Sequence, residues 1–144
     1  MSARRKFILL VEDNPDDEAL TLRALRKHDL ADEVVVVRDG AEALAFFYEA
    51  TRAGDEHLPE LVLLDLKLPK VDGLQVLKIL RDDAHTRRLP IVVLSSSSEE
   101  RDIAQSYDLG ANSYVRKPVD FAEFSEAVRQ LAIYWLGLNE PSPR

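Results

Sequence analysis

The sequence predicts an α/β protein with a doubly wound parallel sheet, built from five consecutive strand and helix pairs. Short apolar runs alternate with helical patterns along the chain, and neither an internal repeat nor a linker interrupts them. This alternation predicts right-handed crossovers and helices on both faces of the sheet. The apolar runs are continuous, which is typical of strands buried on both faces. With 144 residues, 46% of them hydrophobic, the chain suffices for one domain with one core.

The chain opens on a predicted strand and an amphipathic helix. Residues 7–11 are apolar and lead directly into Glu12 and Asp13. An Asn-Pro turn signal follows, which places Pro at the first position of a helix. Apolar residues at helical spacing extend this helix over residues 15–28.

The second strand and helix come next. Residues 34–37 form a short β-branched strand. Asp39 is placed to cap the following helix, with Glu42 as its partner in a capping box. Residues 49–60 are polar and are expected to connect this helix to the third strand.

The third strand is the segment around which the rest is organised. Four apolar residues, 61–64, lead straight into Asp65, and Asp72-Gly73 signals a turn shortly afterwards. Asp65 is therefore expected where a buried central strand meets its loop, the edge at which parallel sheets bind ligands. Taken alone, an Asp at this position is equally explained as a cap or the start of a loop.

The second half of the chain continues the same alternation. Its expected elements are a helix over 74–81, a strand over 91–94, a helix over 99–109, a strand over 112–116 and a helix from 120 to about 136. Gly110 is the usual residue after a helix, and Asp120 with Glu123 forms a second capping box. Residues 137–144 are expected to be a tail. We therefore expect a single domain over residues 1–144, with its core over about 6–136 and no output domain.

Composition excludes several classes of function. The formal net charge of −7 argues against a nucleic-acid partner, for which a basic surface is expected. Without cysteine, the chain has neither disulfides nor thiolate metal ligands. The apolar run after Arg4, Arg5 and Lys6 is too short for a signal peptide, and no run approaches the ~20 residues of a membrane span. A cytoplasmic protein without membrane contacts is expected.

Four predicted strands deliver reactive side chains to one edge of the sheet. The residues at these strand ends are Glu12 and Asp13, Asp65, Ser95, and Lys117. Each has an ordinary explanation by itself: an acidic turn, a serine cap, a surface lysine. Four reactive residue types at four equivalent positions nevertheless favour a functional site.

The chemistry of these residues points to phosphoryl transfer. Carboxylates that crowd together repel one another unless a cation is bound, and Mg²⁺ prefers such oxygen ligands. A carboxylate such as Asp65 can attack phosphorus to give an acyl phosphate. Lys117 and Mg²⁺ would neutralise the phosphoryl oxygens, and the Ser95 hydroxyl would donate to one of them.

With these residues, nearly the whole chain resembles the receiver domain of two-component response regulators. The matching positions are the acidic pair Glu12-Asp13, the phosphoacceptor Asp65, the switch hydroxyl Ser95, the switch aromatic Tyr114 and the pair Lys117-Pro118. The resemblance implies a flavodoxin-like fold with strand order 2-1-3-4-5. It also implies a metal ligand in the backbone carbonyl of Lys67 and a cis bond between Lys117 and Pro118.

The resemblance extends to stand-alone regulators that serve phytochrome histidine kinases. The long polar stretch 49–60 and the apolar stretch 131–136 carry this similarity. It implies that a sensor histidine kinase donates a phosphoryl group to Asp65 in a Mg²⁺-dependent reaction. The protein would then catalyse only its own phosphorylation and dephosphorylation and would not be an enzyme with a separate substrate.

Two alternative interpretations assign the chain to a different class of function. A Mg²⁺-dependent phosphohydrolase resembling the haloacid-dehalogenase type also begins with an aspartyl nucleophile, but it carries a second Asp where this chain has Lys67. A receiver that binds without chemistry would have lost residues of the site, and all of them are present here.

The last helix predicts an interface, and one aromatic residue, Tyr114, is involved in the expected response to phosphorylation. One apolar stripe is expected to face the sheet; its members are Phe121, Phe124, Val128, Leu131, Trp135 and Leu138. Ile133, Tyr134 and Leu136 remain, which favours a second protein surface at this end of the helix. The receivers that the chain resembles pair through the fourth helix, fifth strand and fifth helix, so the resemblance implies a homodimer through this face, with Tyr134, Trp135 or Leu136 near its centre. Movement of Ser95 would let Tyr114 turn inward and tune this pairing, although Tyr114 is also explained as a half-buried strand residue.

Overall fold

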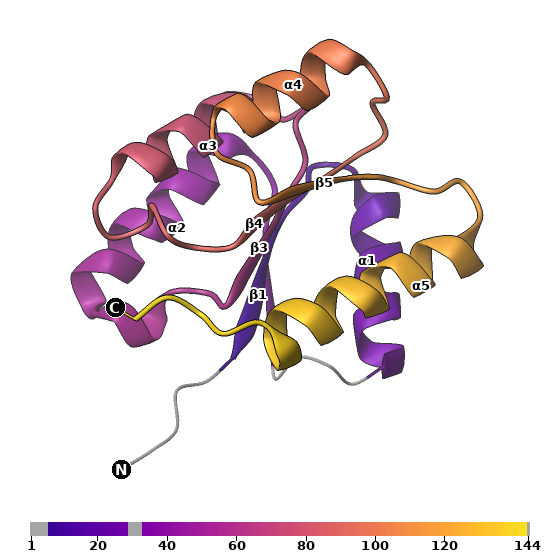
Figure 1. The fold of residues 1–144 in the computed structure, drawn as a ribbon, viewed down its shortest axis with the longest axis horizontal. Coiled ribbons are helices and arrows are strands. Elements are labelled where there is room, and N and C mark those ends of the chain that lie inside the picture. The colour runs from indigo at the N-terminus through magenta and orange to yellow at the C-terminus, as the bar shows by residue number, and fades with distance from the viewer. Residues whose placement is uncertain (1–5, 29–32, 144) are drawn as a thin grey trace.

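The computed structural model, which describes residues 6–28 and 33–143, forms a five-stranded parallel sheet covered by helices on both faces (Figure 1). The strands are β1 (Phe7–Val11), β2 (Glu33–Val37), β3 (Leu61–Leu64), β4 (Ile91–Ser95) and β5 (Ser113–Arg116). Their order is β2-β1-β3-β4-β5, and every neighbouring pair is parallel. The predicted fold class and strand order are confirmed. Arg4 and Arg5, named above, lie outside the described residues, as does the last residue of the predicted tail.

Five α-helices form the outer layers. They are α1 (Pro15–His28), α2 (Gly40–Ala53), α3 (Gly73–Asp82), α4 (Glu100–Asp108) and α5 (Phe121–Ala132). Helices α1 and α5 lie together on one side of the sheet, and α2, α3 and α4 cover the other (Figure 1). No helix in the described parts of the chain has the length and apolar content needed to cross a membrane.

The central strand shows why the apolar runs are continuous. Successive side chains of a strand point to opposite faces. Leu61 and Leu63 therefore join the core formed with α1 and α5, while Val62 and Leu64 join the core formed with α2 and α3. All four are fully buried, so both faces of β3 require apolar residues.

The stretch 49–60 contains more regular structure than a polar connection. Helix α2 continues to Ala53, and a 3-10 turn follows over Asp55–His57. Ala50 is buried against the core in the last turns of α2, which accounts for the extra helical length.

The end of the last helix differs from the predicted stripe. Helix α5 passes into a π-helical segment, Ile133–Leu138, in which the Asn139 N–H donates to the Tyr134 carbonyl. Because a π-turn holds more residues than an α-turn, the segment rotates relative to the expected stripe. Leu136 thereby enters the core, and Leu138 is 70% exposed. The expectation that Leu138 faces the sheet and that Leu136 remains outside the core was wrong.

Candidate functional site

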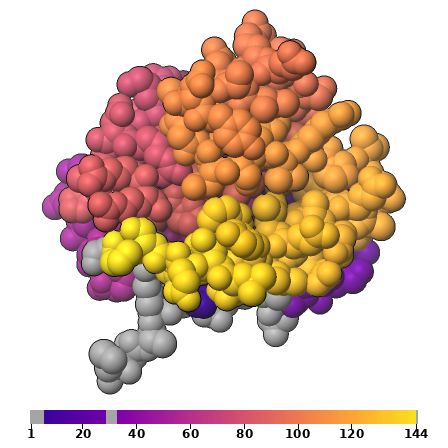
Figure 2. Space-filling view, viewed as in Figure 1, coloured from indigo at the N-terminus to yellow at the C-terminus, as the bar shows by residue number. Residues whose placement is uncertain are grey.

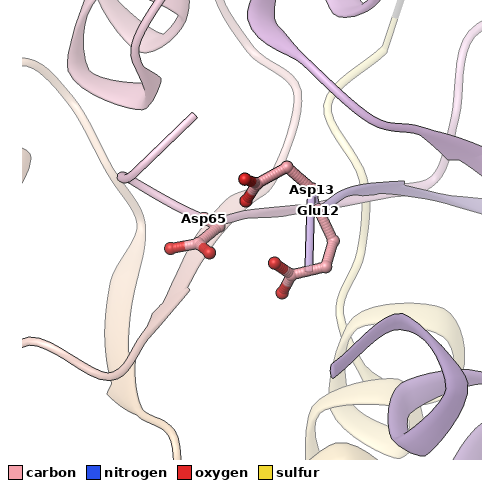
Figure 3. Close-up of side chains that lie close together, drawn as sticks. All are labelled: Glu12, Asp13 and Asp65. Atoms are coloured by element: carbon pink, nitrogen blue, oxygen red, sulfur yellow. The ribbon is translucent and has the colours of Figure 1, made fainter. Parts of the chain in front are cut away.

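Three carboxylates converge at the carboxyl edge of the sheet. Glu12 and Asp13 directly follow β1, and Asp65 directly follows β3. Because β1 and β3 are neighbours with Val11 opposite Leu64, the residues that follow them are also adjacent. Each of the three offers a carboxylate oxygen, and these oxygens lie within 4.8 Å of one another. The close-up in Figure 3 shows the side chains grouped at this edge.

Lys117 reaches into this group from the end of β5. Its side chain is only 7% exposed. The Nζ atom lies 2.7 Å from Glu12 Oε1, 2.8 Å from Asp17 Oδ2 and 3.3 Å from Asp65 Oδ2. The three N–H bonds of the ammonium group are thus directed at three carboxylates.

Asp17 is a member of the site that sequence reasoning did not assign to Lys117. The Asn14 side chain accepts hydrogen bonds from the Asp16 and Asp17 N–H groups and so caps α1. This cap fixes the first turn of α1, from which the Asp17 carboxylate meets Lys117. The Asn-Pro turn signal predicted the helix start, but no local pattern connects two residues that lie 100 positions apart.

Burial sets the protonation behaviour of the site. Desolvation raises the pKa of Glu12 to about 7; the repulsion of Asp65 adds to this rise, and the hydrogen bond from Lys117 opposes it. Burial alone would lower the pKa of Lys117, but its hydrogen bonds with Asp17 and Glu12 outweigh that effect and raise it. Lys117 therefore stays charged, and Glu12 ionises more easily when a further cation is near.

The donor set fits a hard divalent cation. Carboxylates are the ligands that Mg²⁺ uses in proteins, usually one or two of them together with water and phosphate oxygens. Asp13 and Lys67 also line a depression of about 380 Å³ beside the carboxylates, which leaves room for such further ligands. The Lys67 N–H points to Asp65 Oδ1 at 3.4 Å. The metal-binding role expected for the Lys67 carbonyl remains a prediction.

The loop that carries Asp65 is closed tightly onto α3. The Gly73 N–H donates to the Leu66 carbonyl, and the Asp72 side chain caps α3 by accepting from the Gln75 N–H. A Cβ atom on Gly73 would overlap with the carbonyl oxygen of Asp65, so only glycine fits at this position. The turn signal in the sequence thus fixes the position of Asp65.

Ser95 and Tyr114 both contact the loop that follows β4. Ser95 is fully buried, and its Oγ atom accepts a hydrogen bond from the Ser97 N–H at 3.2 Å. Within the described residues, no acceptor is found for the hydroxyl proton of Ser95. Tyr114 is partly buried against the core, and its hydroxyl donates to the Ser97 carbonyl at 2.8 Å.

The expected cis bond between Lys117 and Pro118 is not present. All peptide bonds between described residues are trans. The Lys117 N–H donates to the Ser95 carbonyl at 2.8 Å, and its side chain reaches the carboxylates in this geometry.

Comparison with known proteins agrees with this architecture. The family described as response regulator receiver domain matches residues 8–129. The response regulator Rcp1 of Synechocystis sp. is 36% identical over 131 residues, which cover 91% of this chain and 89% of Rcp1. A structure of its Mn²⁺-bound form superposes with a TM-score of 0.83 and 34% identity, covering 96% of this chain and 99% of that one.

Two further solved structures are similar along almost the whole chain. The phosphorylated cyanobacterial phytochrome response regulator RcpA has a TM-score of 0.86 and 40% identity, covering 96% of this chain and 99% of its own. The bacteriophytochrome response regulator AtBRR has a TM-score of 0.71 and 50% identity, and the match covers 96% of this chain and 100% of AtBRR. From its fold, its converging carboxylates and these similarities, the chain belongs to the response regulator receiver domain family of two-component signal transduction.

Proposed function

We propose that this protein is a cytoplasmic response regulator that accepts a phosphoryl group on Asp65 from a sensor histidine kinase. The observation that carries the proposal is the meeting of the Asp65, Glu12 and Asp13 carboxylates with the Lys117 ammonium group. In the forward step, an Asp65 oxygen attacks the phosphorus of the kinase phosphohistidine. The P–N bond breaks, and its electron pair stays on the histidine ring. Hydrolysis of the resulting acyl phosphate restores Asp65 and releases inorganic phosphate.

The roles of the remaining residues follow from their positions. Lys117, already in contact with Asp65, would bind an oxygen of the transferred group. The buried Ser95 hydroxyl would donate its available proton to another. Glu12, Asp13, Asp65 and the Lys67 carbonyl would hold Mg²⁺, and Rcp1 has been solved with Mn²⁺. When bound, the metal would offset the negative charge of the phosphoryl oxygens.

Similarity to phytochrome response regulators supports a phytochrome-type kinase as the partner. RcpA is a phytochrome response regulator at 40% identity, and AtBRR is a bacteriophytochrome response regulator at 50% identity. The preference of this protein for one kinase over another can be measured by mixing it with autophosphorylated kinases and comparing the initial rates of phosphoryl transfer. We expect a phytochrome-type kinase to be the faster donor, and equal rates from an unrelated kinase would contradict this assignment.

A small-molecule phosphodonor tests the chemistry without a kinase. Incubation with acetyl phosphate and Mg²⁺ should give a hydroxylamine-sensitive label, up to one phosphoryl group per chain, and EDTA should prevent it. The same preparation should not turn over p-nitrophenyl phosphate. Sustained hydrolysis of that ester would instead support the Mg²⁺-dependent phosphohydrolase.

We further propose that the protein pairs as a homodimer through α4, β5 and α5. In Figure 2, α4 and the C-terminal segment lie on the same face of the molecule. Large apolar or aromatic residues are exposed on this face. Tyr107 on α4 is 49% exposed, and in the π-helical segment Ile133–Leu138 Tyr134 is 48% and Leu138 70% exposed. Because Leu136 is buried and Trp135 packs against the core, Tyr134 and Leu138 replace them as expected interface anchors.

Light scattering at micromolar concentration tests this pairing. We expect a dimer for the unmodified protein, strengthened by phosphorylation, and a monomer for the double variant Tyr134→Glu with Leu138→Glu. A control variant, Tyr48→Glu, changes an exposed aromatic residue on α2 and should remain dimeric. A monomer with and without acetyl phosphate would refute the dimer.

A further inference from the structure

Ser97 is hydrogen-bonded through its N–H, its carbonyl and its hydroxyl group. Its N–H donates to Ser95 Oγ at 3.2 Å, and its carbonyl accepts from the Tyr114 hydroxyl at 2.8 Å. Its own hydroxyl donates to Asp102 Oδ2 at 2.6 Å and accepts from the Glu99 N–H at 3.2 Å. One small residue thus joins the hydroxyl next to the phosphorylation site, the aromatic residue on β5 and the start of α4.

Asp102 holds the Ser97 side chain in place from helix α4. It lies in the first turn of α4 and is only 6% exposed, although it carries a carboxylate. A buried carboxylate needs hydrogen-bond partners, and the Ser97 hydroxyl is the side-chain donor that it has within the described residues. Glu99, at the N-cap position of α4, makes no side-chain capping bond. The start of α4 is therefore held through Ser97 and Asp102.

We propose that Ser97 and Asp102 are positioning residues of the phosphorylation switch, which connect Ser95 to α4 and Tyr114. This inference rests on the proposed phosphorylation of Asp65. The Asp102 carboxylate anchors the Ser97 side chain, and the Ser97 backbone then holds both Ser95 and Tyr114. Neither residue contacts the reacting atoms, so both act through Ser95.

The hydrogen-bond arrangement explains how the connection works. The Ser97 N–H uses a lone pair of Ser95 Oγ and leaves the hydroxyl proton of Ser95 for a phosphoryl oxygen. When Ser95 moves toward that oxygen, it displaces Ser97. Because the Ser97 side chain is hydrogen-bonded to Asp102, Ser97 cannot move without α4. The displacement of Ser97 is therefore passed on to α4 and to the Tyr114 hydroxyl. Without this anchor, the loop would adjust locally and Tyr114 would not respond.

A purely structural role makes a different prediction. If Ser97 and Asp102 only cap α4, their removal would destabilise the helix and leave the response of Tyr114 to phosphorylation intact. The test must therefore record the state of Tyr114 separately from stability and from the extent of phosphorylation.

Fluorine NMR of protein labelled with 3-fluorotyrosine gives this readout. The chain has four tyrosines, and Tyr114→Phe identifies the Tyr114 resonance. The resonance is recorded before and after acetyl phosphate and Mg²⁺, while intact mass measures phosphorylation and thermal melting measures stability. The variants are Ser97→Ala and Asp102→Ala, with Asp102→Asn as the conservative change because its amide oxygen still accepts from Ser97. Asp108→Ala, at the exposed far end of α4, is the matched control.

We expect the Ser97→Ala and Asp102→Ala proteins to be phosphorylated as fully as the unmodified protein but to lose the phosphorylation-dependent shift of Tyr114. Asp102→Asn should retain most of the shift, and Asp108→Ala all of it. If Asp102→Ala fails to fold, Ser97→Ala compared with Ser97→Thr, which keeps the hydroxyl, decides the question. A full Tyr114 shift in the folded alanine variants would overturn the inference, whatever their stability. Absence of any phosphorylation in the unmodified protein would refute the proposed function itself and, with it, the inference.

Discussion

At the scale of single residues, Lys117 holds the site together electrostatically. Its ammonium group lies within 3.3 Å of three carboxylates, two of them on residues that are almost fully buried. Removing one partner of a buried ionic group leaves the other charges uncompensated, which typically costs about 3–5 kcal/mol. A bound divalent cation would take over part of this compensation.

Lys117→Met should therefore lower the free energy of unfolding by about 3 kcal/mol or more in EDTA. Millimolar Mg²⁺ should recover a larger part of the loss than it adds to the unmodified protein, because the carboxylates then lack their internal cation. Urea unfolding with and without Mg²⁺ measures both effects. The control is Lys78→Met, whose ammonium group contacts Asp82 on an exposed face of α3 and whose loss should cost less than about 1 kcal/mol. Equal losses for the two variants would contradict this account of Lys117.

The residues of the site were predictable to different degrees. Glu12, Asp65 and Ser95 stand at the ends of apolar runs, so the sequence alone placed them at one edge of the sheet. The contact between Asp17 and Lys117 was not predictable, because it depends on how the first turn of α1 faces the end of β5. The same holds for Ser97 and Asp102, whose hydrogen bond requires the observed course of the loop after β4.

At the scale of elements, one arginine connects α3 to two loops. The Arg81 guanidinium group donates to the carbonyls of Gly110 at 2.8 Å and Leu89 at 2.7 Å, and to Asn112 Oδ1 at 2.8 Å. Gly110 has a φ of +102°, and a Cβ atom there would lie 2.9 Å from Arg81 Cγ. The loops before β4 and β5 are thus fixed to the same side chain.

Arg81→Met should destabilise the protein by about 2–4 kcal/mol, because several carbonyl groups lose a charged donor at once and some are left buried without a partner. Arg38→Met is the matched control. Arg38 makes two hydrogen bonds, to the Glu18 carboxylate, but its side chain is 59% exposed, so its loss should cost much less than the loss of Arg81. Chemical denaturation of the two variants compares them directly. If Arg81→Met is no more costly than Arg38→Met, the guanidinium group does not connect these loops as described.

Strands were easier to predict than the ends of helices. The three central strands β1, β3 and β4 are short, buried runs that are apolar except for Ser95 at the end of β4, and the observed bounds of β3 match residues 61–64. The end of α5 was predicted less well, because an apolar stripe is read with a period of 3.6 residues, whereas Ile133–Leu138 is π-helical. The change of period moved Leu136 inward and Leu138 outward.

At the scale of the whole molecule, metal binding should be linked to folding. The carboxylates that would hold Mg²⁺ come from the ends of β1 and β3, so they are brought together only in the folded chain. A ligand that binds only the folded state adds about 2.7 kcal/mol at a hundred times its dissociation constant.

The melting temperature should therefore rise from EDTA to millimolar Mg²⁺. Asp13→Asn is the informative variant, because it removes one of the three converging charges without touching Lys117, and it should abolish most of the rise. Differential scanning calorimetry at fixed ionic strength separates this effect from general screening of the net charge of −7. An identical melting temperature in EDTA and in Mg²⁺ would show that the metal site is wrong.

The architecture as a whole was predictable because its determinants are local and repeated. Alternating strand and helix patterns define a parallel α/β sheet, and resemblance to receivers supplied the strand order that the structure confirms. Properties that depend on one particular contact, such as the trans bond before Pro118 or the burial of Leu136, required the assembled chain.

The central claim is that Asp65, and not its neighbour Asp13, receives the phosphoryl group. Unmodified protein, Asp65→Asn and Asp13→Asn are each incubated with acetyl phosphate and Mg²⁺, and the modified residue is located by mass spectrometry after borohydride reduction of the acyl phosphate. Modification is expected at Asp65 alone in the unmodified protein and is expected to be absent from Asp65→Asn. In Asp13→Asn a reduced amount is expected, still at Asp65, because metal binding is weakened. Full labelling of Asp65→Asn, or a label on Asp13, would contradict it.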